Sequence, residues 1–127
     1  MSKVTGVLFD VKGSGNARVE TIENELDEYY RILKCDIFDI THLRIGKHRY
    51  DIYCDDNGLL KTDRIVSAVD CRRNPMLVGN LFVTKTDEEG ETISLSEEEI
   101  KEVLANTKNI IDVERLKTYT VLVCEYN

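Results

Sequence analysis

The sequence has no tryptophan, a single proline and only three phenylalanines among its 127 residues, whereas it has six tyrosines. Most of its aromatic side chains therefore carry a hydroxyl group, which needs a hydrogen-bond partner when it is buried. No apolar run reaches the length of a membrane-spanning helix, and the first 11 residues lack the apolar segment and cleavage site of a signal peptide. We therefore expect a cytoplasmic protein with no membrane partner.

Positive charge is also scarce. The sequence has 17 lysines and arginines and 24 acidic residues, which gives a formal net charge of −7 and a pI near 4.9. Direct binding of DNA or RNA depends on basic side chains that neutralise phosphates, so no direct nucleic-acid binding is expected. The hydrophobic share of 42% and the charged share of 32% are typical of a folded chain. Its length predicts a single domain, residues 1–127.

Motifs of metal and cofactor chemistry are missing as well. Among Cys35, Cys54, Cys71 and Cys124 there is no Cys-x-x-Cys pair, which disfavours a structural zinc site. In the cytoplasm we expect four reduced and mostly buried thiols. The glycines at 13 and 15 are not followed by the Gly-Lys-Ser/Thr of a phosphate loop. We predict no cofactor and no metal.

Two histidines invite a catalytic interpretation that the sequence does not support. His42 and His48 flank a predicted turn, and either could pair with Asp51 or Cys54 as a base–nucleophile pair or a metal site. Pairing across such a turn is loosely set and no third ligand is clearly placed, so exposed hairpin histidines are the better interpretation. No catalytic residues are predicted, and the chain is expected not to be an enzyme.

Residues 76–104 are the stretch around which the chain is organised. Residues 77–83 form an apolar run typical of a buried strand, with Gly79 marking a bulge or a close backbone contact. Residues 87–90 have the composition of a turn in which Gly90 adopts a positive φ. This segment predicts a strand that leads into an acidic turn.

The clearest local signal follows that turn. Ser96 and Glu99 form a capping box, so a helix begins after Ser96, and Leu95 and Ile100 occupy the hydrophobic-staple positions. The apolar stripe of this helix is Ile100, Val103 and Leu104.

The remaining elements follow from alternation and helical spacing. Strands are predicted at residues 3–11, 18–21, 36–45, 48–54 and 118–124. In the first strand, Val7 and Phe9 share one face and Leu8 the other. A helix is predicted at residues 22–34, and residues 110–116 are interpreted as a linker or a short turn. Turns are expected at Gly46-Lys47 and at residues 55–58.

These elements predict an α+β fold in which an antiparallel sheet of about five or six strands packs against two main helices. The structure of residues 59–75 is the least determined by the sequence.

The acidic residues are concentrated in one segment. Residues 87–102 hold eight acids and one base, a local net charge of −7 that equals the formal charge of the whole chain. Capping and solubility are the common uses of such acids, but a concentrated patch is typical of a surface that meets a basic partner. We predict a partner-binding surface with tyrosine anchors, formed by Asp87, Glu88, Glu89, Glu91, Glu97, Glu98, Glu99, Glu102, Tyr29, Tyr30 and Tyr50.

Three short motifs between residues 18 and 108 suggest a family. They are IENEL at residues 22–26, DDNGLL at residues 55–60 and GNLFV at residues 79–83, the last leading through EGE to SLSEEEI at residues 94–100. With these motifs the chain resembles a family of small proteins defined only as a domain of unknown function. Members of that family are frequent in phages, plasmids and conjugative elements of Gram-positive bacteria. The resemblance implies a mobile-element accessory protein and no catalytic residues.

We therefore predict a non-enzymatic accessory protein of a mobile element, in particular an anti-CRISPR-like inhibitor of a bacterial defence nuclease. Its acidic surface would dock into a basic nucleic-acid channel and mimic phosphate. The expected partner is a host nuclease effector or its nucleic-acid complex.

Two alternatives are open. The first is a small-ligand or nucleotide-binding domain that uses a basic hairpin and a second basic point, Arg44, Arg49, Arg72 and Arg73. The second is a structural homo-oligomer, such as a homodimer, in which the acidic helix of one copy meets the basic hairpin of another.

Overall fold

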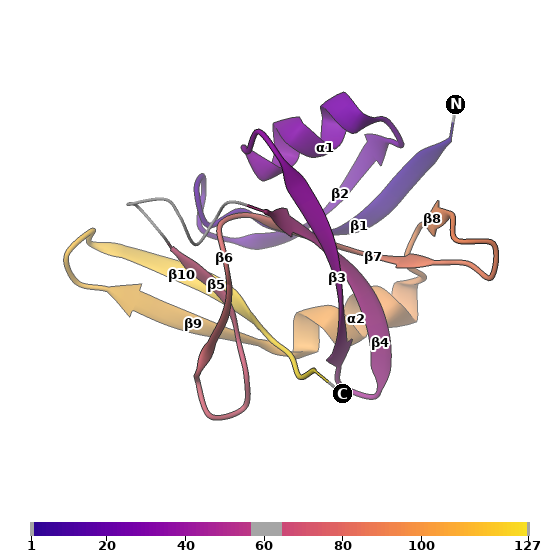
Figure 1. Ribbon diagram of the computed structural model, residues 1–127. Coiled ribbons are helices and arrows are strands. Elements are labelled where there is room, and N and C mark those ends of the chain that lie inside the picture. Colours follow the sequence, from indigo (N-terminus) through magenta and orange to yellow (C-terminus); the bar gives the residue numbers. More distant parts are fainter. Residues whose placement is uncertain (1, 57–64, 127) are drawn as a thin grey trace.

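A computed structural model describes residues 2–56 and 65–126, and within them the chain forms two β-sheets and two short helices (Figure 1). The strands are β1 (Lys3–Phe9), β2 (Ala17–Glu23), β3 (Phe38–Ile45), β4 (His48–Asp55), β5 (Val66–Val69), β6 (Pro75–Val78), β7 (Leu81–Thr86), β8 (Thr92–Ile93), β9 (Thr107–Asp112) and β10 (Lys117–Val123), and the helices are α1 (Leu26–Leu33) and α2 (Glu97–Ala105).

The first sheet is antiparallel in the order β2-β1-β7-β4-β3, with β8 paired to the end of β7. The second sheet has the order β6-β5-β10-β9, and its β5–β10 pair is parallel. The expected α+β fold, with one sheet packed against two main helices, is therefore wrong. The protein is mainly β, because segments expected to be helix, loop or linker join strands instead.

The two faces of the first sheet are covered differently. Val7 and Phe9 are buried in a cluster with residues of α2 and of β5 and β10, whereas Leu8 is buried in a cluster with residues of α1. This confirms the predicted alternation along β1. Figure 1 shows α1 on one side of this sheet, and α2 with the second sheet on the other side.

The expected buried strand at residues 77–83 is two strands in different sheets. Residues up to Val78 belong to β6 and pair with β5, and from Leu81 onward the chain runs as β7 between β1 and β4. The change of sheet occurs at Gly79 and Asn80, where Gly79 has a φ of 78° that favours glycine. The glycine taken as a sign of a bulge or close contact therefore marks a crossing between sheets.

The helix expected at residues 22–34 begins only at Leu26. Ile22 lies opposite Val4 in the β1–β2 ladder and is 2% exposed, so its apolar side chain is buried from a strand. Apolar residues at positions 22 and 26 have the spacing of one helix face, but the same pattern arises when a strand ends near residue 22 and a helix begins at residue 26. The tertiary pairing decides in favour of the strand.

The β3–β4 hairpin forms as predicted. Ile45 pairs with His48 around a turn at Gly46 and Lys47, and Gly46 has a φ of 63°. Tyr50 and Ile52 point into the same cluster as Val7, as expected for one face of the strand. The predicted turn at residues 55–58 lies partly outside the described residues.

The start of α2 also forms as predicted. The capping box of Ser96 and Glu99 is present, and Leu95 and Ile100 contribute to one apolar cluster. Leu104, expected in the apolar stripe, is 38% exposed. The next residues form β9, so residues 110–112 of the expected linker or turn are strand, whereas residues 113–116 do form a turn. The β-branched residues of β9 favour this outcome.

Within the described residues, neither helix combines the length and the apolar character needed to cross a membrane.

Candidate functional site

The eight carboxylates of the acidic segment divide into two groups. Five of them form what we call the acidic end. Their side chains are exposed and make no ion pair within residues 2–56 and 65–126, and they are Glu88, Glu89, Glu91, Glu97 and Glu98. The other three, Asp87, Glu99 and Glu102, bind groups of the protein itself.

Asp87 and Glu99 hold the backbone that carries the acidic end. Asp87 Oδ1 accepts hydrogen bonds from the backbone N–H groups of Glu89 and Glu91, each at 2.9 Å, which closes the turn before β8. Glu99 accepts from the backbone N–H of Ser96 at 2.7 Å and from Lys85 Nζ at 2.8 Å. The Lys85 contact joins the end of β7 to the first turn of α2, so the two parts of the acidic end are tied together.

Glu102 anchors α2 to the β3–β4 hairpin. Its Oε1 accepts from Tyr50 Oη at 2.6 Å and lies 2.7 Å from His48 Nδ1, and its Oε2 accepts from the backbone N–H of Lys47 at 3.2 Å. Burial alone raises the pKa of Glu102, but the contacts with Tyr50 and His48 outweigh it and hold the pKa below 4.5. Burial and the same carboxylate raise the pKa of Tyr50.

A groove of about 500 Å³ adjoins the acidic end. Its lining includes three carboxylates, Glu98, Glu99 and Glu102, opposed by Lys85 and His48. Because Glu99 and Glu102 are already bonded within the protein, Glu98 is the lining carboxylate that makes no ion pair in the described part of the chain.

Two of the three tyrosines expected as anchors are core residues. Tyr29 is 3% exposed and its ring stacks on Tyr53 with centroids 4.3 Å apart. Tyr50 is 1% exposed and donates to Glu102. Neither ring is accessible to a partner. Tyr30 is half-buried on α1 beside Phe38.

Two of the four arginines of the alternative ligand site line hollows, and these two hollows are different. Arg49 lies in a groove of about 600 Å³ that also contains Asp51 and Glu99, and Arg73 lines a hollow of about 460 Å³ beside β9. Arg44 is partly buried on β3, and Arg72 is exposed in the β5–β6 turn. Their arrangement does not build one basic pocket around a single ligand.

The two hairpin histidines each contact a carboxylate. His42 Nδ1 lies 2.5 Å from Asp51 Oδ1, and His48 Nδ1 lies 2.7 Å from Glu102 Oε1. Both side chains are more than half exposed. Across the described residues no three His, Cys, Asp or Glu side chains are arranged to hold a metal ion.

The cysteines form no disulfide. Cys54 and Cys124 are buried, and burial raises the pKa of each thiol to about 12. They are therefore protonated and poor nucleophiles near neutral pH.

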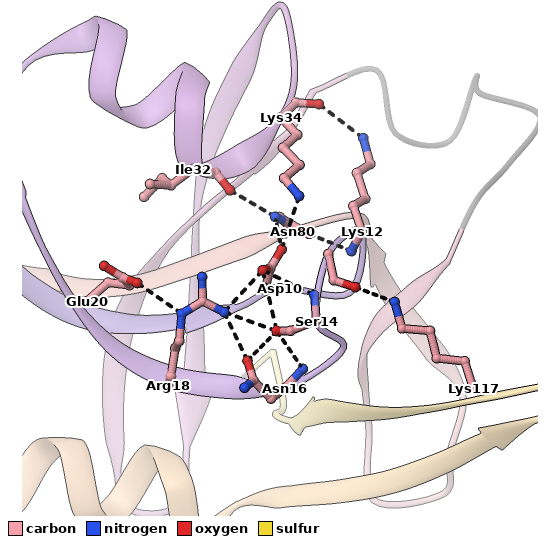
Figure 2. A network of polar contacts seen from close by, with 11 residues as sticks. Asp10, Lys12, Ser14, Asn16, Arg18, Glu20, Ile32, Lys34, Asn80 and Lys117 are labelled. Atoms are coloured by element: carbon pink, nitrogen blue, oxygen red, sulfur yellow. Dashed lines mark hydrogen bonds and ion pairs between the residues drawn. The ribbon is translucent and has the colours of Figure 1, made fainter.

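One cluster of polar side chains, shown in Figure 2, was not predicted. We call it the Asp10 network, and it surrounds the loop between β1 and β2. Its labelled residues in Figure 2 are Asp10, Lys12, Ser14, Asn16, Arg18, Glu20, Ile32, Lys34, Asn80 and Lys117. Arg18 Nη1 donates to Asp10 Oδ2 at 3.1 Å, and Lys34 Nζ lies 3.7 Å from Asp10 Oδ1. Asn80 is fully buried and donates to Asp10 Oδ1 and to the carbonyl of Ile32, each at 2.9 Å.

The Asp10 network joins four parts of the fold: the β1–β2 loop, the end of α1, the segment between β6 and β7, and β10. Asn80 Oδ1 also accepts from the backbone N–H of Lys12 at 2.9 Å, and Lys12 Nζ donates to the carbonyl of Lys34 at 3.2 Å. Lys117 Nζ donates to the carbonyl of Gly13, which ties in β10 (Figure 2). These contacts use the polar groups of the network internally, so its arrangement is that of a structural junction. The signal that could have revealed it is a lone amide, Asn80, inside an apolar run.

Comparisons with known proteins supply a family and nothing beyond it. The family model described as a domain of unknown function, DUF3846, matches residues 4–108. No curated protein and no solved structure matches the chain.

Proposed function

We propose that this chain, which belongs to the DUF3846 family, is a non-enzymatic protein that docks its acidic end onto a basic surface of a partner protein. The observation that supports the proposal is the acidic end itself. It has five exposed glutamates from two chain segments, none of them in an ion pair within the described residues.

The backbone under these glutamates is ordered before any partner arrives. The Asp87 turn, the positive φ of Gly90 and the Ser96–Glu99 capping box each set a local conformation. Because little backbone entropy is lost on docking, more of the electrostatic attraction contributes to affinity. Surface glutamates on an unordered tail would lack this advantage.

The negative charges of the acidic end lie together at one end of the molecule. Figure 1 shows the β7–β8 hairpin and the start of α2 at the same end, in agreement with the Lys85–Glu99 ion pair. A surface with several unpaired negative charges is attracted to lysines and arginines that otherwise contact phosphates. The partner class that this chemistry fits is a protein with a basic nucleic-acid channel.

In its specific form, the proposal is that the protein is an accessory protein of a mobile element such as a phage or plasmid. The partner is then a host defence nuclease, such as a CRISPR effector or its nucleic-acid complex, and the acidic end blocks its channel. This form depends on the sequence resemblance described above and on the charge geometry.

A competition experiment with a purified CRISPR effector tests this form. The wild-type chain should weaken DNA binding by the effector, and this inhibition should decline as salt concentration rises. Neutralising Glu88, Glu89, Glu97 and Glu98 to glutamine should weaken the inhibition by about tenfold or more.

A matched control changes the net charge equally at another place. Its four substitutions are Glu25→Gln, Asp27→Asn, Asp36→Asn and Glu114→Gln, all at exposed positions. Retained inhibition by this control, with loss in the acidic-end variant, supports the proposal. Inhibition retained equally by both variants would show that the acidic end does not dock, and absence of inhibition by the wild type would exclude this effector as the partner.

A further inference from the structure

The outer edge of β9 differs from the other sheet edges. No segment of residues 2–56 or 65–126 pairs with it, because β9 is the last strand of the second sheet. Such an edge presents backbone N–H and C=O groups that can pair with another strand.

Among the other edge strands, β8 has only two residues, and β2, β3 and β6 carry features that hinder such pairing. On β2, Arg18 and Glu20 are charged and form an ion pair. On β3, both backbone polar groups of Arg44 bond to Glu125, and β6 begins at Pro75, which has no N–H to donate. Edges modified in these ways resist the addition of a strand. The β9 edge lacks comparable protection along residues 109–111.

Apolar exposure is concentrated at the same place. Four of the ten large hydrophobic residues that are exposed in the described structure lie on β9 or on the turn after it: Ile110 at 39%, Ile111 at 73%, Val113 at 77% and Leu116 at 89%. The hollow of about 460 Å³ beside β9 is lined in part by Val69, Ile110 and Ile111. An open edge with an apolar surface beside it is a docking surface for a β-strand.

The residues of β9 identify the strand that fits. In antiparallel pairing of β9 with a second β9, a two-fold axis at Ile110 sets the two Ile110 side chains opposite each other. The same register sets Lys108 opposite Asp112 of the second copy, twice in the symmetric pair. A shift by one residue would set Lys108 opposite Ile111 and lose both charge pairs. Self-complementarity of this kind is what a two-fold interface requires.

The faces of the strand agree with this register. In the β9–β10 ladder, Lys108 lies opposite Val121, Ile110 opposite Tyr119 and Asp112 opposite Lys117. Val121 and Tyr119 belong to one buried apolar cluster, so Lys108, Ile110 and Asp112 share that face. Pairing two copies would extend this cluster across the interface and place a charge pair on each side of it.

We propose that β9 is a homodimer interface at which a second copy of this chain adds its own β9 in antiparallel register about Ile110. The two four-stranded sheets become one continuous sheet. This surface is separate from the acidic end, so the proposal is independent of the proposed function.

Sedimentation equilibrium of the full chain tests the proposal. The wild type should be a dimer, and Ile110→Lys should raise its dissociation constant by about tenfold or more, because two lysines then face each other across the axis. Leu26→Lys, at a residue that is 65% exposed on α1, is the matched control and should leave the dimer unchanged.

Charge exchange tests the register. Lys108→Asp alone should weaken the dimer by about tenfold or more, since Asp then faces Asp. Asp112→Lys alone should weaken it similarly, because Lys faces Lys. An equimolar mixture of the two variants should recover dimers, since each Asp then faces a Lys of the other chain.

Circular dichroism is used to check that each variant is folded, because Asp112 also bonds to Arg115 in the β9–β10 turn. If Asp112→Lys does not fold, the comparison of Lys108→Asp and Ile110→Lys with Leu26→Lys decides the matter. A monomeric wild type, or a dimer that persists in both Lys108→Asp and Ile110→Lys, would overturn the proposal.

Discussion

The side-chain amide of Asn80 donates to Asp10 Oδ1 at 2.9 Å, across 70 residues of sequence. Asp10 follows the end of β1, and Asn80 stands where the chain leaves the second sheet for the first. The same amide also donates to the carbonyl of Ile32 near the end of α1. One buried side chain, at the crossing between the two sheets, therefore connects this crossing to the loop after β1 and to the end of α1.

Replacing Asn80 by alanine should lower the free energy of unfolding by about 2–4 kcal/mol. The substitution leaves the carbonyl of Ile32 and the N–H of Lys12 without their amide partner in a buried place. Urea denaturation followed by circular dichroism measures the loss. Lys101→Ala, at an exposed position on α2, is the control and should change stability by less than about 0.5 kcal/mol. Equal effects of the two substitutions would contradict a structural role for the Asp10 network.

Acid should reduce the contribution of Asp10 to stability. Burial raises the pKa of this carboxyl, but hydrogen bonds from Asn80 and Arg18 outweigh burial and keep the pKa below 3.8. The ionised carboxylate therefore stabilises the fold above pH 3.8, and this contribution is lost as the pH falls through its folded pKa.

The substitution Asp10→Asn isolates that contribution. It should lower the free energy of unfolding by about 2 kcal/mol at neutral pH, because Arg18 and Lys34 lose a charged partner. Between neutral pH and pH about 3, the variant should lose less stability than the wild type. Urea denaturation across this pH range measures both curves, and parallel curves would show that Asp10 is not responsible.

The bond between Tyr50 and Glu102 should account for part of the attachment of α2 to the hairpin. Tyr50→Phe and Glu102→Gln should each cost about 1 kcal/mol, and the double variant should cost less than the sum by at least about 0.5 kcal/mol. A double-mutant cycle in urea measures this coupling.

Tyr119→Phe provides the control for that cycle, because Tyr119 is also buried but lies on β10. Its effect should add to that of Glu102→Gln within about 0.3–0.5 kcal/mol. Coupling of the same size in both cycles would mean that the cycles do not detect the Tyr50–Glu102 bond.

Leu116→Gly should stabilise the protein. Leu116 has a φ of 51° and is 89% exposed, so the substitution relieves a left-handed backbone conformation and removes almost no buried surface. We expect a gain of about 0.5–1 kcal/mol in the free energy of unfolding. Leu104→Gly, inside α2, should instead lose about 1 kcal/mol. A destabilising Leu116→Gly would indicate that the Leu116 side chain makes contacts in the folded protein.

Short-range features of this fold could be predicted from the sequence because their interactions span only a few residues. The capping box joins residues three apart, and the Gly46-Lys47 turn joins neighbouring strands, so each is determined by local chemistry. Alternation along β1 was also predictable, since successive strand side chains point to opposite faces.

The acidic end shows where such prediction stops. The concentration of acids in residues 87–102 was evident in the sequence, but three of its eight carboxylates bind groups of the protein itself. Glu102 accepts from Tyr50, which lies 52 residues away. Composition cannot reveal such a contact, because it depends on how α2 packs against the hairpin.

By itself, the sequence determined the local turns, the start of α2, the alternation of β1 and the concentration of negative charge. The tertiary structure alone decided that β6 and β7 belong to different sheets, that β9 is a strand, and that Asn80 and Asp10 are bonded. The physical reason is the sequence separation between the groups that interact. Caps and turns satisfy backbone groups within a few residues, whereas the partner of a strand edge or of a buried amide depends on which distant segment reaches it.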